Sequence, residues 1–272
     1  MGINVLSLFD GMSCGQIALN KCGIEYDNYF ASEIDKYAIQ VTQVNYPNTK
    51  QLGSITELDG TKLPKIDLLF GGSPCQGFSF SGKQLNFEDQ RSKLFFEFVR
   101  LIKECNPSYW LLENVVMKKE YEKVISEYLG VEPVKINSSL VSAQNRVRLY
   151  WANFEILQPK DKNIGLLDIL EKLDFNREPY DEKYKSNEAV LHTKDKFNTL
   201  RANAGSKTRG IGICNKLGWW RKLTCTECER LQTVPENYTN YVSDSQRYKM
   251  VGNGWTVDMI AHIFKNLSNE NL

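Results

Sequence analysis

The chain has 272 residues, of which 42% are apolar and 25% are charged. This length predicts one large domain, or one domain with a smaller partner, and the composition excludes disordered, collagen-like and coiled-coil proteins. The formal net charge of +1 excludes a protein that is coated uniformly with basic residues for nucleic-acid binding.

Strand-like and helix-like segments alternate through the first half of the chain. Short apolar runs predict strands, and apolar residues at helical spacing predict helices. Strands separated by helices predict an α/β protein with a parallel, doubly wound sheet. The predicted strands are Ile3–Phe9, Tyr29–Glu33, Ile66–Gly72, Tyr109–Leu112, Val134–Leu140 and Val147–Phe154, and the predicted helices are Gly15–Lys21, Asp35–Val44, Ser92–Glu104 and Glu120–Tyr128.

The alternation stops after Phe154. Residues 155–220 hold one helical stretch, Leu166–Leu173, within polar, charged and glycine-rich sequence, which we interpret as a second, smaller module. Regular structure returns with a helix over Thr224–Gln232, where a threonine and a glutamate three residues later have the spacing of a capping box. A final amphipathic helix follows, with Val257, Ile260, Ile263, Phe264 and Leu267 on one face.

One stretch of this smaller module is strongly basic. From His192 to Lys222 the chain carries eight lysines and arginines but only one acid, Asp195. A localised basic segment indicates a contact with a polyanion, and a solvated charged loop is the alternative interpretation.

The sequence shows little sign of a membrane-spanning segment, a secretory signal or a set of disulfides. No stretch approaches 18 uninterrupted apolar residues, and the N-terminus lacks the pattern of a secretory signal. Seven scattered cysteines do not form a disulfide framework, and Cys225-x-x-Cys228 has no second ligand pair nearby. We therefore expect a cytoplasmic protein without a metal site or a membrane partner.

Polar groups follow several predicted strands, and in open α/β sheets ligands bind beyond the carboxyl ends of the strands. The turn Phe9–Gly15 carries glycines that let backbone N–H groups approach a ligand closely, although turn glycines are often only structural. Glu33 lies where a carboxylate can hold two ribose hydroxyls, which would serve NAD and S-adenosylmethionine equally well. A surface carboxylate is the alternative.

A thiol and a second carboxyl group follow two further strands. Cys75 lies in Pro74-Cys75-Gln76, just after the apolar run that ends at Gly72. It can be a nucleophile only as a thiolate, and an inert core cysteine is the alternative. Glu113 follows Trp110-Leu111-Leu112, where a carboxyl group is unfavourable unless it is paired or used, for instance as a proton donor.

Two arginines lie at the start of the strand predicted over Val147–Phe154, one just before it and one within it. Alternation along a strand would send Arg146 and Arg148 to the same side. There they could bind a substrate oxygen or phosphates, or form a surface ion pair instead.

Six motifs occur in a fixed order along the chain and together resemble the DNA (cytosine-5) methyltransferases. They are Phe9–Gly15, Pro74-Cys75-Gln76, Glu113-Asn114-Val115, Gln144-x-Arg146-x-Arg148, Thr224-x-x-Glu227-x-x-Arg230-Leu231-Gln232 and Gly252-Asn253-Gly254. The resemblance covers nearly the whole chain except about 155–220. The C-terminal Gly254-Trp255-Thr256-Val257 and the short middle module look most like the animal de novo methyltransferase domain and its small microbial or phage relatives.

The resemblance implies a Rossmann-like S-adenosylmethionine-dependent methyltransferase with a mostly parallel seven-stranded sheet. It implies a catalytic domain over residues 1–154 and 221–272 and a small inserted target-recognition module over residues 155–220. It also implies methyl transfer to C5 of cytosine in double-stranded DNA, with the target base flipped out of the helix.

The implied catalytic residues are Cys75, Glu113, Arg146 and Arg148. Cys75 would bond to C6 of the ring, and Glu113 would hold the base at N3 and its exocyclic amine. Arg148 would bind the base O2, with Arg146 supporting the catalytic loop or Cys75. The implied residues around S-adenosylmethionine are Phe9, Asp10, Gly11, Gly15, Glu33, Ile34, Ser54, Ile55, Gly71, Asn253 and Trp255.

DNA contacts are expected from two places. The stretch from Phe78 to Asp89 resembles the mobile catalytic loop of the family, and Thr199-Leu200-Arg201-Ala202 resembles an element of its target-recognition modules. The expected DNA-binding residues are Ser79, Ser81, Lys83, Gln84, Arg201, Lys207 and Arg209, with a flexible basic loop as the alternative for the last three.

The chain departs from the family pattern in three ways. One is the short target-recognition module, which can hold few base-reading elements, so we expect a recognised sequence of only a few bases. Ser54 stands where an acid usually holds the adenine amino group, and Ser13 and Cys14 stand where a second glycine is common. These last two departures put the affinity and adenine selectivity of the cofactor site in question.

Three other functions stay open on the residues alone. A tRNA cytosine-5 methyltransferase of related sequence would use the same chemistry on structured RNA. A non-catalytic methyltransferase-like regulator would need a broken site, whereas Cys75, Glu113 and Arg148 are all present. A nicotinamide dehydrogenase could share the glycine turn and Glu33, but would leave Pro74-Cys75-Gln76 unexplained. Restriction protection, phage self-modification and epigenetic marking all need the same reaction.

Overall fold

The computed structural model describes residues 2–74, 90–171, 176–179, 189–190, 196–202, 212–214 and 219–268, which form two compact units. The first unit comprises Met1–Ile136, Val147–Gln158 and Ala261–Leu272, and the second comprises Asn137–Arg146 and Pro159–Ile260. These two units are defined by how the segments pack together, and packing alone does not show which unit binds the cofactor or the target. The division into a catalytic domain and a target-recognition module therefore stays a prediction.

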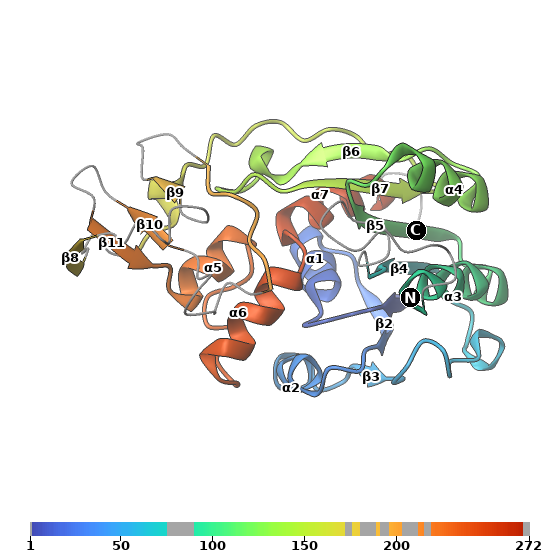
Figure 1. The fold of residues 1–272 in the computed structure, drawn as a ribbon. Helices are drawn as coiled ribbons and strands as arrows, with labels where there is room; N and C mark the ends of the chain where they lie inside the picture. Colours follow the sequence, from blue (N-terminus) through green and yellow to red (C-terminus); the bar gives the residue numbers. More distant parts are fainter. Residues whose placement is uncertain are drawn as a thin grey trace. The chain divides into compact units, whose positions relative to one another are not determined.

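A seven-stranded sheet forms the centre of the first unit, in the order β3-β2-β1-β4-β5-β7-β6 (Figure 1). The strands are β1 (Ile3–Leu8), β2 (Tyr26–Ser32), β3 (Lys50–Gln51), β4 (Leu68–Gly72), β5 (Tyr109–Val115), β6 (Val134–Asn137) and β7 (Val147–Ala152). Strands β1 to β5 pair in parallel, and β7 pairs with β5 in the antiparallel direction. This arrangement confirms the predicted α/β fold with a mostly parallel sheet.

Helices cover both faces of this sheet. They are α1 (Cys14–Cys22), α2 (Lys36–Asn45), α3 (Gln90–Cys105), α4 (Lys119–Leu129) and α7 (Val257–Ser268). On one face, Phe70 of β4 packs against Phe264 of α7, with ring centroids 5.2 Å apart. On the other face, Leu69 shares a core cluster with Phe98 of α3 and Ile125 of α4. Adjacent residues of β4 thus serve opposite layers, as strand geometry requires.

The second unit contains two α-helices, α5 (Cys225–Leu231) and α6 (Asp244–Asn253), among its described residues. Helix α5 starts with the predicted capping box, because Thr224 Oγ1 accepts from the N–H of Glu227 and Glu227 accepts from the N–H of Thr224. The segment with Cys225 and Cys228 is therefore helical, as predicted.

Short strands form a second sheet in the region that the sequence shows as irregular. It has the order β8-β11-β10-β9, from β8 (Asn176–Pro179), β9 (Ala189–Val190), β10 (Gly212–Cys214) and β11 (Trp219–Lys222). Strands of two to four residues are too short to show an alternating pattern, so sequence analysis missed them.

Most predicted elements differ from the structure by one to three residues at an end, and two of them also differ in kind over part of their length. The strand expected over Val134–Leu140 ends at Asn137, whose side chain accepts from the N–H of Ser139 and caps the 3-10 turn η2 (Ser138–Leu140). The helix expected over Leu166–Leu173 is the 3-10 turn η3 (Leu166–Ile169), followed by extended backbone at Leu170. A further 3-10 turn, η1 (Gly60–Lys62), precedes β4. None of the helices in the described part of the chain could cross a membrane.

Candidate active site

The carboxyl ends of β1, β2, β4 and β5 meet at one edge of the sheet, because these strands are parallel. Strand β1 lies between β2 and β4, so the strand order reverses there. Ligands of open α/β sheets bind at such a reversal. The residues at and just beyond the carboxyl ends of these four strands are therefore the candidate site of the first unit.

The turn between β1 and α1 is built from unusual backbone conformations. Phe9, Gly11 and Ser13 all have positive φ, at 57°, 59° and 60°. A Cβ at Gly11 would meet no atom within 4 Å, so its outer side is open. A non-glycine residue rarely adopts this conformation, and two of them in one turn indicate a backbone held by its surroundings.

Hydrogen bonds to the Glu33 carboxylate help to fix the backbone of this turn. Its Oε2 accepts from the N–H of Gly11 at 2.7 Å, and its Oε1 accepts from the N–H groups of Ile34 and Asp35 at 2.7 and 2.8 Å. The carboxylate thus joins the ends of β1 and β2. Beside it, the side chain of Ile34 is 77% exposed, which leaves an apolar surface at the strand end.

Asp10 is buried within a cluster of hydroxyl groups. It accepts hydrogen bonds from Ser13 Oγ and from the Tyr29 hydroxyl, the latter at 2.7 Å. Burial raises the pKa of Asp10 to about 6, although the hydrogen bonds from Ser13, Ser7 and Tyr29 oppose the shift. The charge of Asp10 therefore changes close to neutral pH.

The loop Gly53-Ser54-Ile55 lies beyond the short strand β3. Ser32 Oγ donates to the carbonyl of Gly53 at 2.9 Å, and Arg100 of α3 donates to the carbonyl of Ile55 at 3.0 Å. The Ser54 hydroxyl lies 2.8 Å from the Thr56 hydroxyl. The loop that was expected to meet adenine is thus fixed from both sides, with a hydroxyl where the family usually has an acid.

Two glycines of the expected cofactor site have a packing role. A Cβ at Gly15 would lie 2.3 Å from the ring of Phe70, and a Cβ at Gly71 would lie 2.7 Å from the carbonyl oxygen of Leu8. Both glycines let neighbouring elements approach closely. A direct contact with a cofactor stays a prediction for them.

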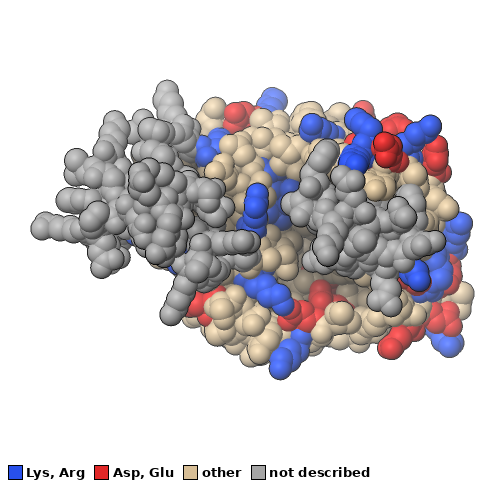
Figure 2. All heavy atoms as spheres, viewed as in Figure 1, with Lys and Arg blue, Asp and Glu red and all other residues tan. Residues whose placement is uncertain are grey.

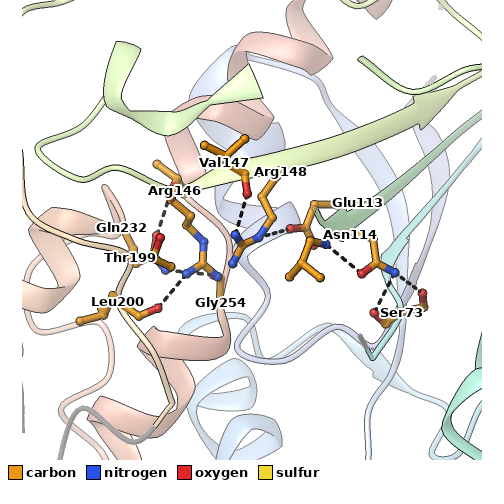
Figure 3. A network of polar contacts seen from close by, with 12 residues as sticks. Ser73, Glu113, Asn114, Arg146, Val147, Arg148, Thr199, Leu200, Gln232 and Gly254 are labelled. Carbon is orange, nitrogen blue, oxygen red and sulfur yellow. Dashed lines mark hydrogen bonds and ion pairs between the residues drawn. The ribbon is translucent and has the colours of Figure 1, made fainter. Parts of the chain in front are cut away.

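Glu113 and Arg148 form an ion pair across β5 and β7. Arg148 Nε lies 2.8 Å from Glu113 Oε1, and the two side chains are only 13% and 10% exposed (Figure 3). Arg148 also donates to the carbonyl of Val147 at 2.8 Å. The antiparallel register of the strands, which pairs Val115 with Arg148, brings the predicted proton donor to the predicted base-binding arginine.

Asn114 ties the same strand to the end of β4. Its amide donates to Ser73 Oγ at 3.0 Å and to the carbonyl of Ser73 at 3.4 Å, and its oxygen accepts from the N–H of Val115 at 2.8 Å (Figure 3). Gly72 is the register partner of Glu113. The chain therefore leaves the sheet towards Pro74 right beside Glu113.

Several predicted site residues lie outside the described residues. They are Cys75, Ser79, Ser81, Lys83, Gln84, Lys207 and Arg209. Their roles stay predictions. In the segment that follows β4, the described residues end at Pro74, one residue before the predicted nucleophile.

Arg146 has a different setting from Arg148. Strand β7 begins at Val147, so the alternation argument that put both arginines on one side does not apply. Arg146 is 4% exposed and donates to the carbonyls of Leu200, Gly252 and Gly254 at 2.9, 3.4 and 2.9 Å (Figure 3). Its guanidinium joins segments of the second unit, and support for Cys75 stays a prediction.

The remaining described candidates also belong to the second unit. Arg201 and Asn253 are exposed, and Trp255 is half-buried. On the face shown in Figure 2, basic and acidic side chains of the described residues are mixed. Among the described residues, no group of three or more His, Cys, Asp or Glu side chains is placed to hold a metal ion.

Sequence analysis gave no role to Ser73, Asn114, Tyr29 or Gln232. The sequence pointed to only two of these four residues. Asn114 and Gln232 stand inside recognised motifs, but the hydrogen bonds of all four depend on tertiary neighbours that no local pattern shows.

Comparisons with known proteins agree with this geometry. The model of the C-5 cytosine-specific DNA methylase family matches residues 3–129 and 119–269. The type II methyltransferase M1.ScrFI of Lactococcus lactis subsp. cremoris is 31% identical over 302 residues, covering 97% of this chain and 77% of the relative. The type II methyltransferase M.HhaI of Haemophilus parahaemolyticus is 29% identical over 316 residues, covering 98% and 95%.

Solved structures show the same fold. The Entamoeba histolytica methyltransferase EhMeth superimposes with a TM-score of 0.82 at 16% identity, covering 99% of each chain. The family match spans almost the whole chain and includes Glu113, Asn114 and Arg148. The chain belongs to the C-5 cytosine-specific DNA methylase family and is a DNA (cytosine-5) methyltransferase of that family.

Proposed function

We propose that this chain transfers a methyl group from S-adenosylmethionine to C5 of a flipped-out cytosine in duplex DNA, through a transient bond between Cys75 Sγ and C6. The observation that carries the proposal is the buried Glu113–Arg148 pair beside Gly72, the last residue of β4, three residues before Cys75 in the sequence. A carboxyl group and a guanidinium at this place match the N3 edge and the O2 of cytosine.

Cys75 would begin the reaction as a thiolate. Cytosine C5 is a weak nucleophile because the ring is aromatic and electron-poor. Addition of the sulfur to C6 makes C5 enamine-like, so that C5 can attack the sulfonium methyl group. The bond between that methyl carbon and the sulfonium sulfur then breaks, and S-adenosylhomocysteine leaves. Loss of the C5 proton to a base and expulsion of the sulfur then restore the ring as 5-methylcytosine and free the thiolate.

Glu113 and Arg148 would stabilise the charge that develops on the ring. Glu113 would hold N3 and the exocyclic amine and supply a proton to N3, and Arg148 would hold O2. Their ion pair aligns both groups before the base arrives, since the two side chains are largely buried and fixed to neighbouring strands. Such prearrangement lowers the reorganisation that the transition state requires.

The turn after β1 would bind the methyl donor. Its residues fit the group: Gly11 is open on its outer side, Glu33 offers carboxylate oxygens at the strand end, and Ile34 exposes an apolar surface suited to a purine. Phe9 would pack against the adenine, and Asp10 and Gly11 would lie at the methionine end. Asn253 and Trp255, which belong to the second unit, stay predicted cofactor residues.

Arg201 would contact DNA, together with Lys207, Arg209 and the stretch from Phe78 to Asp89. Removing the base from the stack is required because neither face of C6 is accessible inside a duplex. Arginine suits phosphate oxygens and base edges alike.

The test incubates the protein with methyl-labelled S-adenosylmethionine and varied DNA duplexes, digests the product to nucleosides and separates them. We expect label in 5-methylcytosine only, and none with Cys75→Ala, which should still bind S-adenosylhomocysteine. A parallel arm with folded tRNA separates the RNA-methylating alternative. Label in RNA but not in DNA, or full turnover by Cys75→Ala, would contradict the proposal.

A further inference from the structure

The side chain of Gln232, at the end of α5, makes four hydrogen bonds and is fully buried. Its Nε2 donates to the carbonyls of Val251 and Gly254 at 2.9 and 3.0 Å. Its Oε1 accepts from Gln144 Nε2 and from Thr256 Oγ1, both at 2.8 Å. Every donor and acceptor of this amide is therefore used, and each contact reaches a different residue.

Three of these contacts fix the segment around Asn253 and Trp255. The carbonyls of Val251 and Gly254 lie on either side of Asn253, and the Thr256 hydroxyl follows Trp255 directly. Arg146 binds the carbonyl of Gly254 as well, at 2.9 Å. The backbone that carries the exposed Asn253 is thus held at both ends.

The fourth contact, with Gln144, connects Gln232 to a second segment, residues 197–200. Gln144 is also fully buried, and its Oε1 accepts from the N–H of Leu200 at 3.2 Å. The neighbouring backbone pairs with the same segment, since the N–H of Asn145 donates to the carbonyl of Phe197 at 2.7 Å. Thr199 Oγ1 donates to the carbonyl of Asn145 at 2.6 Å. Residues 197–200, which precede the exposed Arg201, are therefore held by the Gln144 side chain at Leu200 and by the Asn145 backbone at Phe197 and Thr199.

The two segments also touch each other directly. A Cβ at Gly252 would lie 2.3 Å from the carbonyl carbon and oxygen of Arg201, so only glycine permits this approach. Arg146 bridges the same two segments by binding the carbonyls of Leu200 and Gly252. All of these residues belong to the second unit.

We propose that Gln232 is a positioning residue that holds, from one buried amide, both the Asn253–Trp255 segment and, through Gln144, the Arg201 segment. This inference rests on the proposed function, which assigns the first segment to the cofactor and the second to DNA. Gln232 touches neither ligand. Its removal loosens both binding segments at once.

Three substitutions that nearly keep the shape of the side chain separate the contacts to the Asn253–Trp255 segment from the contacts to the Arg201 segment. Gln144→Leu removes the bonds of Gln144 to Leu200, to Gln232 and to the carbonyl of Leu231. It leaves Gln232 bound to Val251, Gly254 and Thr256. Thr256→Val removes one bond on the cofactor side only. Gln232→Leu removes all four bonds.

The experiment measures KM for S-adenosylmethionine and KM for a duplex substrate, with kcat, in these variants. For Gln232→Leu we expect both KM values to rise by about tenfold, the equivalent of ~1.4 kcal/mol at each ligand. Gln144→Leu raises KM mainly for DNA, and Thr256→Val raises it mainly for the methyl donor. Tyr248→Phe, which removes a buried hydrogen bond to the carbonyl of Leu223 in the same unit, is the matched control and leaves both KM values unchanged.

The pattern distinguishes positioning from loss of stability. A variant that only unfolds more easily lowers the active fraction, and therefore kcat, with both KM values unchanged. If Gln232→Leu does not fold, Gln232→Glu replaces it, because the carboxylate keeps the two acceptor bonds and loses the two donor bonds. That variant should raise KM for the methyl donor and affect DNA less.

Two reference variants separate failure of the inference from failure of the proposed function. Trp255→Ala should weaken binding of S-adenosylhomocysteine, and Arg201→Ala should weaken binding of DNA. If either reference variant binds its ligand normally, the underlying assignment is wrong. If both weaken binding while the substitutions of Gln232 change neither KM, the role of Gln232 is overturned.

Discussion

Arg148 Nε and Glu113 Oε1 lie 2.8 Å apart between two antiparallel strands, with both side chains close to fully buried. A buried ion pair of this kind contributes little stability in itself, because desolvation of the charges offsets their attraction. Removing one partner is costly, however, because the other charge is left without compensation. The arrangement is therefore better explained by chemistry at the strand end than by stability.

Glu113→Gln tests that explanation. The amide keeps the shape of the side chain but cannot supply a proton, so we expect kcat to fall at least about 100-fold. Binding of S-adenosylhomocysteine, followed by equilibrium titration, should change less than about twofold, a free-energy difference below that of one hydrogen bond. Glu122→Gln is the control, since Glu122 is also buried and paired, with Lys119. Similar losses of kcat in both variants would contradict a catalytic role for Glu113.

Asn114→Leu tests the link between β5 and the end of β4. The substitution removes the bonds to Ser73 Oγ and to the carbonyl of Ser73, so the segment that leads to Pro74 is less well fixed. We expect kcat to fall about tenfold, the effect of losing roughly one net hydrogen bond in the transition state. Ser73→Ala removes only one of the two bonds and should have a smaller effect. A larger loss in Ser73→Ala than in Asn114→Leu would contradict this account.

Much of this site was predictable because strand ends in a parallel sheet meet at one edge. The apolar runs before Phe9 and Glu33 located two of those ends, whereas Glu113 lies inside β5, which continues to Val115 and not only to the predicted Leu112. The Thr224–Glu227 spacing located the start of a helix. These signals are local, and they hold whatever the distant parts of the chain do. The alternation of strands and helices predicted a parallel sheet, which holds for β1 to β5, whereas β7 is antiparallel to β5.

Contacts that depend on distant segments were not predictable. A lone glutamate such as Glu33 does not show that the backbone of Gly11 will donate to it. Arg146 differs from Arg148 because the strand starts one residue after it, and a boundary shifted by one residue removes the alternation argument. The small second sheet was missed because its strands are too short to carry a period.

Gly15→Ala should destabilise the first unit more than Gly11→Ala. At Gly15 the added methyl group would lie 2.3 Å from the Phe70 ring in a closely packed layer, at a cost of about 2 kcal/mol. At Gly11 there is open space, and only the left-handed conformation at φ 59° disfavours alanine, by about 1 kcal/mol. Denaturant unfolding measures both values. Equal stability of the two variants would show that the α1 helix can move away from β4.

Asp10 should give the protein a pH dependence between its ordinary pKa of 3.8 and its raised pKa of about 6. Burial favours the protonated form of Asp10 in the folded state, so folding binds a proton in this range. The contribution of Asp10 therefore favours the folded state most below 3.8 and is lost as the pH rises through about 6, by roughly 3 kcal/mol in all.

Asp10→Asn removes this titration. The difference in unfolding free energy between the variant and the wild type should shift in favour of the variant as the pH rises to neutral. Chemical denaturation at a series of pH values measures it. A difference that does not change with pH would show that the Asp10 pKa is not raised in the folded protein.

Glu227 should act in the opposite direction. Burial alone would raise the pKa of Glu227, but hydrogen bonds from Arg221 and from the N–H groups of Thr224 and Glu171 outweigh it and lower the pKa below its ordinary value of 4.5. The ionised form is thus favoured by folding. Its stabilisation is present above pH 4.5 and is lost as the pH falls through the lowered pKa of the folded state.

Glu227→Gln should therefore be less stable than the wild type at neutral pH, by about 3 kcal/mol, because Arg221 is left largely buried without a counter-charge. The gap between the two proteins should narrow on acidification, since the protonated glutamate of the wild type becomes equivalent to the amide. Arg230→Gln, which breaks the more exposed pair with Glu236, is the control and should cost less than about 1 kcal/mol. Unfolding free energies of all three proteins, measured from neutral pH downwards, check the prediction. A gap that widens with acidification would mean that the Glu227–Arg221 pair does not stabilise the charged carboxylate.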